Sequence, residues 1–136
     1  MIKFNPIAIL LILLTVSCKN PTNKTVTEPQ SQIEFKQMTY DYGTIPYLGD
    51  GTCKFEFINT SDVPLVINNV KTSCGCTSPE WPTDPCEPGS GGTIKIKYDT
   101  RIKGRFKKSI TIYSNAKNSP VNLIISGEVS SDKPNE

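Results

Sequence analysis

The amino-acid sequence predicts an all-β domain over residues 33–130, an antiparallel sandwich of two sheets with about seven strands. Apolar and polar residues alternate in several segments, and no stretch keeps the 3.6-residue apolar period of an amphipathic helix. Turn residues interrupt the alternation about every ten positions. Without helices to connect parallel strands, neighbouring strands pair antiparallel. The long Pro-rich connection at 78–92 favours two sheets over a closed barrel.

Alternation defines the individual strands. In the segment 53–57, Cys53, Phe55 and Phe57 alternate with charged residues, which predicts one buried face and one wet face. The segment 94–98 alternates in the same way, with lysines facing out. Clusters of Gly, Pro, Asn and Asp separate the elements. The expected strands are, in order, a short one that begins at Phe35 and breaks at 41–43, then 53–57, 65–70, 94–98, 106–113 and 121–129.

The composition excludes most classes of enzyme. The 136 residues suit one compact domain and contain no histidine. This removes Ser-His-Asp and Cys-His catalysis, His-ligated metals and the usual proton-transfer side chain near neutral pH. The chain carries 15 Lys and Arg against 13 Asp and Glu, a net charge of +2, which is too small to indicate nucleic-acid binding. We therefore expect no enzyme activity, no cofactor and no nucleic-acid partner.

The N-terminal segment 1–17 has the pattern of a signal peptide. One cation precedes the apolar stretch 7–14, and small residues lead to Cys18; the stretch is too short to span a bilayer. The segment resembles the lipobox of bacterial lipoproteins, in which signal peptidase II cleaves before a lipidated cysteine, although Thr15 stands where leucine is common. A buried helix or an uncleaved anchor is disfavoured by an early proline and by the polar tail that follows. We expect lipidation at Cys18.

Residues 18–32 are expected to be a lipidated cysteine followed by a flexible tether. The tether has no aromatic residue and too few apolar ones to fold, and by coil scaling it would reach about 20 Å. Several acyl chains on one cysteine give stable membrane anchoring, so a membrane is an expected partner. Because Lys19 and Asn20 are not aspartate, we expect the outer membrane, with the domain facing the periplasm. Residues 131–136 are expected to be a disordered tail.

Several landmarks appear in a fixed order along the predicted sandwich. They are Phe55-Glu56-Phe57-Ile58-Asn59-Thr60, Pro64-Leu65-Val66-Ile67, Ser73-Cys74-Gly75-Cys76-Thr77, Trp81, Pro88-Gly89, 94–99, Gly104, Ser114-Asn115 and 123–127. Over about 35–129 the chain resembles the family called domain of unknown function 1573, whose secreted or lipid-anchored members are abundant in Bacteroidota. The F-x-F-x-N-T and S-C-G-C-T motifs are the most specific parts of the match.

The resemblance implies an immunoglobulin-like sandwich of the PapD-like and ASH-type group. Domains of this group act as binding and assembly modules and not as catalysts, so the resemblance implies a protein partner in the cell envelope. Cys86 stands where the family pattern leads us to expect an apolar residue. It is either a substituted core position or a partner in an extra disulfide.

The four remaining cysteines are Cys53, Cys74, Cys76 and Cys86, an even number in a compartment that permits disulfides. Three full pairings are open. If the C-x-C segment is extended, its two Cα atoms lie about 6.6 Å apart, and direct pairing would need a sharp bend at Gly75. Because consecutive strands run in opposite directions, Cys53 is expected at the same end as the C-x-C segment. Cys53 is therefore the preferred partner for Cys74 or Cys76.

Two alternatives to a disulfide remain open for these thiols, namely free buried cysteines and a metal site. Thiolates of Cys53, Cys74 and Cys76 could hold Cu(I) or Zn(II), which would make the chain a metal-handling lipoprotein. A C-x-C pair alone is weak evidence for such a site, and no histidine can complete a metal shell. A thiol oxidoreductase is disfavoured, because its motif is C-x-x-C and no helix N-terminus is expected here to lower a thiol pKa.

A cluster of five cations gathers around Gly104, from the turn after the strand 94–98 into the strand 106–113. A solvated hairpin is one interpretation; a patch that faces anionic lipid or cell-wall polymer is the other. Trp81, in a Pro-rich loop, is expected to anchor that loop on the sandwich edge and not to form a ligand platform. The members of the candidate patch are Arg101, Lys103, Arg105, Lys107 and Lys108.

Overall fold

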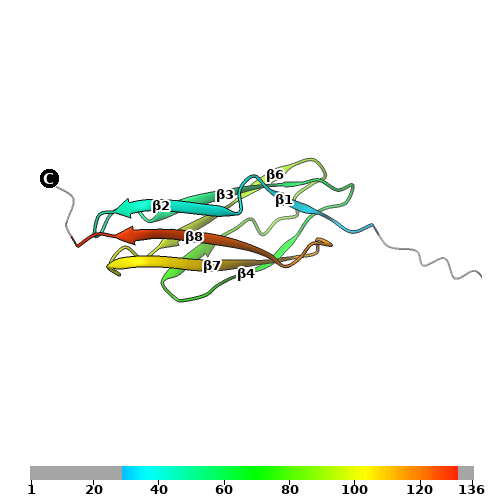
Figure 1. Ribbon diagram of the computed structural model, residues 1–136. Coiled ribbons are helices and arrows are strands. Elements are labelled where there is room, and N and C mark those ends of the chain that lie inside the picture. Colours follow the sequence, from blue (N-terminus) through cyan, green and yellow to red (C-terminus); the bar gives the residue numbers. More distant parts are fainter. Residues whose placement is uncertain (1–28, 132–136) are drawn as a thin grey trace, which may run out of the picture.

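The computed structural model describes residues 29–131, and these form two packed four-stranded sheets (Figure 1). Cys18, the expected signal peptide, most of the expected tether and the C-terminal residues 132–136 lie outside the described residues. Within 29–131, no helix is long and apolar enough to cross a membrane. The strands are β1 (Ile33–Phe35), β2 (Thr39–Ile45), β3 (Thr52–Asn59), β4 (Ile67–Thr72), β5 (Thr77–Glu80), β6 (Gly91–Tyr98), β7 (Gly104–Ser114) and β8 (Val121–Val129).

The first sheet has the order β1-β3-β6-β5, and every neighbouring pair is antiparallel. Its centre is the β3–β6 pair, in which Cys53 faces Ile96 and Phe55 faces Ile94. β5 is a strand that the sequence analysis did not predict, inside the expected connection at 78–92. Only its first residue, Thr77, is buried, so β5 has no apolar alternation to reveal it.

The second sheet has the order β2-β8-β7-β4. β7 pairs antiparallel with both β8 and β4, whereas β2 pairs with β8 in parallel. The expectation of a wholly antiparallel sandwich is therefore wrong at this one pair. After β1 at the edge of the first sheet, the chain crosses to the edge of the second sheet without reversing, so β2 runs in the same direction as β8 (Figure 1). The structure has eight strands against about seven expected, because the first predicted strand is divided into β1 and β2 and because β5 is added.

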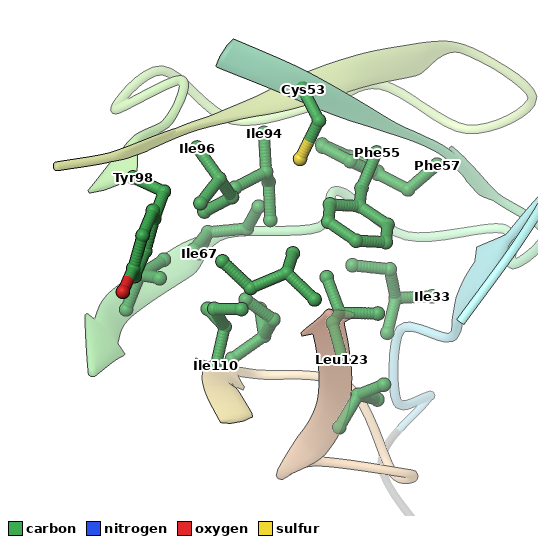
Figure 2. Close-up of a cluster of buried hydrophobic side chains, with 14 of the residues drawn as sticks. Ile33, Cys53, Phe55, Phe57, Ile67, Ile94, Ile96, Tyr98, Ile110 and Leu123 are labelled. Atoms are coloured by element: carbon green, nitrogen blue, oxygen red, sulfur yellow. The ribbon is translucent and has the colours of Figure 1, made fainter. Parts of the chain in front are cut away.

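The core lies between the sheets and consists mainly of isoleucines and aromatic rings (Figure 2). Alternation works as expected in β3, where the odd-numbered residues from Cys53 to Asn59 are buried and the even-numbered ones are exposed. Burying each large apolar side chain contributes about 1.5–3 kcal/mol. Trp81 packs against this core, partly buried, as a loop anchor should. The fully buried apolar side chains include Phe55, Ile94, Ile96, Ile110, Ile112, Leu123 and Ile125.

An aromatic stack closes one end of the core. The rings of Tyr98, from β6, and Phe106, from β7, are parallel within 12° and their centroids lie 3.7 Å apart. Because β6 and β7 belong to different sheets, this stack joins the two layers. Tyr42 packs on the other side of Phe106, with ring centroids 5.7 Å apart, and its hydroxyl donates to the carbonyl of Gly51. Burial raises the pKa of Tyr42 well above its ordinary value.

Asn59 is a buried polar hub at the opposite end of the sandwich. Its amide nitrogen donates to the carbonyls of Val63 (2.8 Å) and Cys86 (2.9 Å), and its amide oxygen accepts from the backbone and hydroxyl of Ser61. Its own N–H donates to the carbonyl of Ser90. One side chain with no exposed surface thus joins the turn after β3 to the segment before β6. This explains the asparagine of the F-x-F-x-N-T motif in structural terms.

Replacing Asn59 with aspartate should destabilise the domain by about 3 kcal/mol, because a buried carboxylate would face two carbonyl oxygens without a donor. The free energy of unfolding from urea titration measures this effect. The matched control is Asn68→Asp, on the exposed side of β4, which should change the stability little. Equal stability of the two variants would contradict the role assigned to Asn59.

Candidate functional site

Three connections meet at one end of the sandwich, which we call the distal end (Figure 1). They are the 46–51 loop between β2 and β3, the 73–76 turn between β4 and β5, and the 99–103 loop between β6 and β7. They meet because β2, β4 and β6 all run toward this end and the strands that follow run away from it. β1 begins at the other end, beside the last residues of β3, which we call the proximal end.

An open hollow of about 670 Å³ lies between these connections. Its lining includes residues 48–51 of the 46–51 loop, Cys76 and Tyr98. Two acidic and two basic side chains line it as well, so it does not select ions of one sign. These four charged residues are Asp50, Lys97, Asp99 and Arg101.

Hydrogen bonds tie the 46–51 loop to the 99–103 loop. The hydroxyl of Thr100 donates to the carbonyl of Gly49 (2.8 Å), and the N–H of Leu48 donates to the carbonyl of Thr100 (3.3 Å). The N–H of Tyr98 donates to the carbonyl of Gly51, where a Cβ would come within 2.4 Å of the Tyr98 carbonyl oxygen. Only glycine permits this close approach. The two loops therefore form one connected surface.

Two carboxylates in the loops are held in the charged state. The backbone N–H and the guanidinium of Arg101 donate to Asp99, at 3.1 Å and at 2.8 and 2.7 Å. These bonds lower the pKa of Asp99 to about 2. Bonds from the hydroxyl and N–H of Thr52 lower the pKa of Asp50 in the same way. Neither carboxyl can act as a proton donor near neutral pH, since both are ionised there.

The 46–51 and 99–103 loops expose apolar side chains that the sequence analysis did not single out. Leu48 is 56% exposed and Ile102 is 46% exposed. Leu48 has a φ of 65°, in the left-handed region that branched residues avoid. Beside it, the ammonium of Lys103 lies 4.6 Å from the ring centre of Tyr47. The available signal was an apolar residue inside each turn segment, Tyr47-Leu48-Gly49 and Arg101-Ile102-Lys103.

Cys74 and Cys76 are bonded to each other, with their Cα atoms 5.3 Å apart. The expectation that Cys53 pairs with one of them is wrong. The C-x-C segment is not extended: it is the tight turn in which the chain leaves the second sheet for the first, which brings the two sulfurs together. In the chain-entropy model, closing a loop of three residues stabilises by about 1.6 kcal/mol, half the value for a loop of twenty. The bond is thus a weak structural cross-link.

The other two cysteines are free and lie apart. Cys53 is 4% exposed and points its sulfur into the core (Figure 2), and burial raises the pKa of its thiol. Its strand does begin at the distal end, as expected. Cys86 is half-buried, and its backbone exchanges hydrogen bonds with Leu65 at the proximal side of the fold. Cys86 is therefore not in an extra disulfide.

The expected copper or zinc alternative finds no support in the described part of the chain. Among residues 29–131, no group of three or more Cys, Asp or Glu side chains is arranged to hold a metal ion. Cys74 and Cys76 are occupied by their mutual bond, and Cys53 is enclosed by apolar side chains. Cys74, Cys76 and Cys53 therefore do not converge as free thiolates on one point.

The five candidate patch cations do not make one uniform surface. Arg101 pairs with Asp99, and Arg105 pairs with Glu128 across the β7–β8 ladder. Lys107 is exposed and Lys108 half-buried, because successive residues of β7 point to opposite faces of the sheet. The structure distributes these charges over the 99–103 loop and both faces of β7.

The comparisons with known proteins agree on the fold. No curated protein matches this sequence. Similar solved structures include a protein of unknown function from Porphyromonas gingivalis W83 (TM-score 0.68, 16% identity, covering 74% of this chain and 48% of that one). They also include an ASH/PapD-like domain of human CEP192 (TM-score 0.62, 9% identity, covering 74% of this chain and 87% of that one). A third is the Pseudomonas aeruginosa CupB2 chaperone (TM-score 0.54, 13% identity, covering 72% of this chain and 56% of that one). This chain thus spans less than half of the Porphyromonas protein.

These likenesses confirm the expected immunoglobulin-like sandwich of the PapD-like and ASH type, and at such low identities they show the fold alone. The family model described as "Protein of unknown function (DUF1573)" matches residues 33–129, which is nearly all of the sandwich. This chain therefore belongs to the DUF1573 family.

Proposed function

We propose that this protein is a lipid-anchored, non-catalytic binding module of the bacterial cell envelope, which holds a partner protein at its distal end. The observation that carries the proposal is the pair of exposed apolar side chains, Leu48 and Ile102, on two loops that hydrogen bonds join. Apolar residues at the centre of a polar surface are typical of the anchor residues of protein interfaces.

The loops are ordered before any partner arrives. Thr100 and Leu48 link the two loops, and Asp99 fixes the start of the second one through Arg101. Binding to such a surface loses little loop entropy, which is one of the main costs of association. The left-handed backbone at Leu48 is a conformation that residues of interaction sites adopt when the surrounding structure enforces it.

The loops suit a partner better than the edge strands of the first sheet do. β1 has three residues and β5 has four, and β5 contains Pro79, which has no N–H to donate to an added strand. Short edges with proline are the usual means of preventing strand addition. We therefore assign partner contact to the distal loops and not to these two edges.

A binding role agrees with the chemistry of the hollow. Its carboxylates are ionised, the chain has no histidine, and Asp99 is committed to Arg101. The fold is similar to that of the CupB2 chaperone. These facts support a module that acts through shape and contact.

Lipid attachment at Cys18 would orient the domain. The described chain enters the sandwich at the proximal end, through β1, so an anchored domain would hold its distal end away from the bilayer. The tether expected over 18–32 would reach about 20 Å. With Lys19 and Asn20 following the cysteine, we place the domain on the outer membrane, facing the periplasm.

Replacing Cys18 with serine should release the protein from the membrane, because the acyl chains can attach only to the thiol. The measurement is membrane fractionation together with incorporation of a labelled fatty acid. Cys86→Ser is the matched control and should stay in the membrane fraction with its label. A Cys18→Ser protein that still carries labelled fatty acid would contradict the anchor.

The pKa of Asp99 tests the order of the 99–103 loop. By NMR, its carboxyl should titrate with a pKa of about 2, and Arg101→Gln should raise this pKa toward 3.8. Because the pKa of the folded state is lowered, the stabilisation is present above the ordinary carboxyl pKa and is lost as the pH falls through about 2. Arg105→Gln should leave the pKa unchanged. A low pKa that persists in Arg101→Gln would argue against this contact.

Partner contact at the distal end can be tested by crosslinking in living cells. A photoreactive amino acid at position 48 should give a defined adduct with a protein, whereas the same residue at position 58, an exposed isoleucine elsewhere, should not. Ile102→Asp should lower the yield of the adduct about tenfold, as the loss of an anchor residue does. Ile58→Asp is the matched control. Equal adducts from positions 48 and 58 would refute the distal site.

A further inference from the structure

The turn that holds the Cys74–Cys76 bond keeps its shape through other interactions. The hydroxyl of Thr72 donates to the carbonyl of Cys74 (2.8 Å), and the N–H of Asp99 donates to the carbonyl of Cys76 (2.8 Å). Before the cysteines, the N–H of Ser73 donates to the carbonyl of Ser109 (3.0 Å). None of these hydrogen bonds involves a sulfur atom, so we expect the fold to persist when the disulfide opens.

The bond is accessible to a reagent from outside. Both cysteines are half-buried, so part of the bond can be reached, and the residue between them, Gly75, is exposed, with no atom within 4 Å of the place that a Cβ would occupy. Cys76 lines the distal hollow, whereas Cys74 does not. A molecule seated in the hollow therefore contacts Cys76 and not Cys74. Exposed disulfides are the labile ones in proteins, in contrast to buried structural ones.

A buried hydroxyl lies beside both sulfurs. Thr77 is 4% exposed, and its Oγ1 lies 3.9 Å from Sγ of Cys74 and 3.9 Å from Sγ of Cys76. A hydroxyl hydrogen rotates freely and can donate to whichever sulfur becomes a thiolate. Such a bond to a charged acceptor stabilises the thiolate and makes it a better leaving group. Among the described residues there is no helix N-terminus to do this, and Thr77 takes that place.

We infer that Cys74–Cys76 is a thiol–disulfide exchange site that accepts two electrons from a dithiol or from two thiols of another molecule. A thiolate attacks Sγ of Cys76, a new S–S bond forms, and Sγ of Cys74 leaves as a thiolate with the electron pair of the broken bond. The second thiol then attacks the sulfur of the first, which releases Cys76. The incoming thiols end as a disulfide, and their two protons pass to the two cysteines.

This site is independent of partner binding through Leu48 and Ile102, so either idea can fail alone. The first test equilibrates the full chain, with Cys86→Ser to remove the half-buried thiol, in glutathione buffers of graded ratio. Alkylation and peptide mass spectrometry measure the state of Cys74 and Cys76. We expect them to pass from disulfide to dithiol within this range while the melting temperature changes little. A bond that resists excess reduced glutathione, or a domain that unfolds when the bond opens, would overturn the inference.

The second test locates the attack. Acid quenching during reduction by glutathione should trap the mixed disulfide on Cys76 and not on Cys74. Thr77→Val should slow the reaction about tenfold and shift its pH profile upward, because the thiolate loses one charge-assisted hydrogen bond. Thr77→Ser should restore the rate, and Thr93→Val, an exposed position on β6, should not change it. An adduct on Cys74, or a Thr77→Val protein with the original rate and profile, would refute the mechanism.

Discussion

The geometry of the distal end depends on Tyr98. Its ring stacks on Phe106 and so joins the two sheets, while its N–H bonds to Gly51 at the start of β3. Tyr98 also stands opposite Thr77, the first residue after the C-x-C turn. The residue that follows, Asp99, begins the loop that carries Ile102. The ring and the backbone of one residue therefore place all three connections of the candidate site relative to one another, and Tyr98 also lines the hollow.

Alternation in the sequence predicted the parts of this fold that have one buried face. β3, β6 and β8 follow it almost to the residue, because their inward positions carry Phe, Ile, Leu or Val against outward polar residues. β5 could not be found in this way, since three of its four side chains are not buried. The parallel pairing of β2 with β8 joins segments about eighty residues apart, and no local pattern encodes that contact.

The sequence predicted the candidate site only in part, because contacts between distant segments also determine its geometry. The C-x-C motif was found, but its pairing was wrong, because the motif was treated as the continuation of a strand. The chain changes sheets there, and only the positions of β4 and β5 in different layers reveal the turn. Leu48 and Ile102 are ordinary apolar residues in sequence. They become notable once the fold leaves both exposed on joined loops.

The two ends of the sandwich differ in how they are stabilised. At the proximal end, both polar atoms of the Asn59 side chain make hydrogen bonds within the protein, so neither is available to a ligand. At the distal end, a half-buried disulfide and exposed apolar side chains contribute little to stability, yet the loops hold them in fixed positions. Natural proteins keep such costly surface features where they are used. That contrast, and not any single motif, is why we assign function to the distal end.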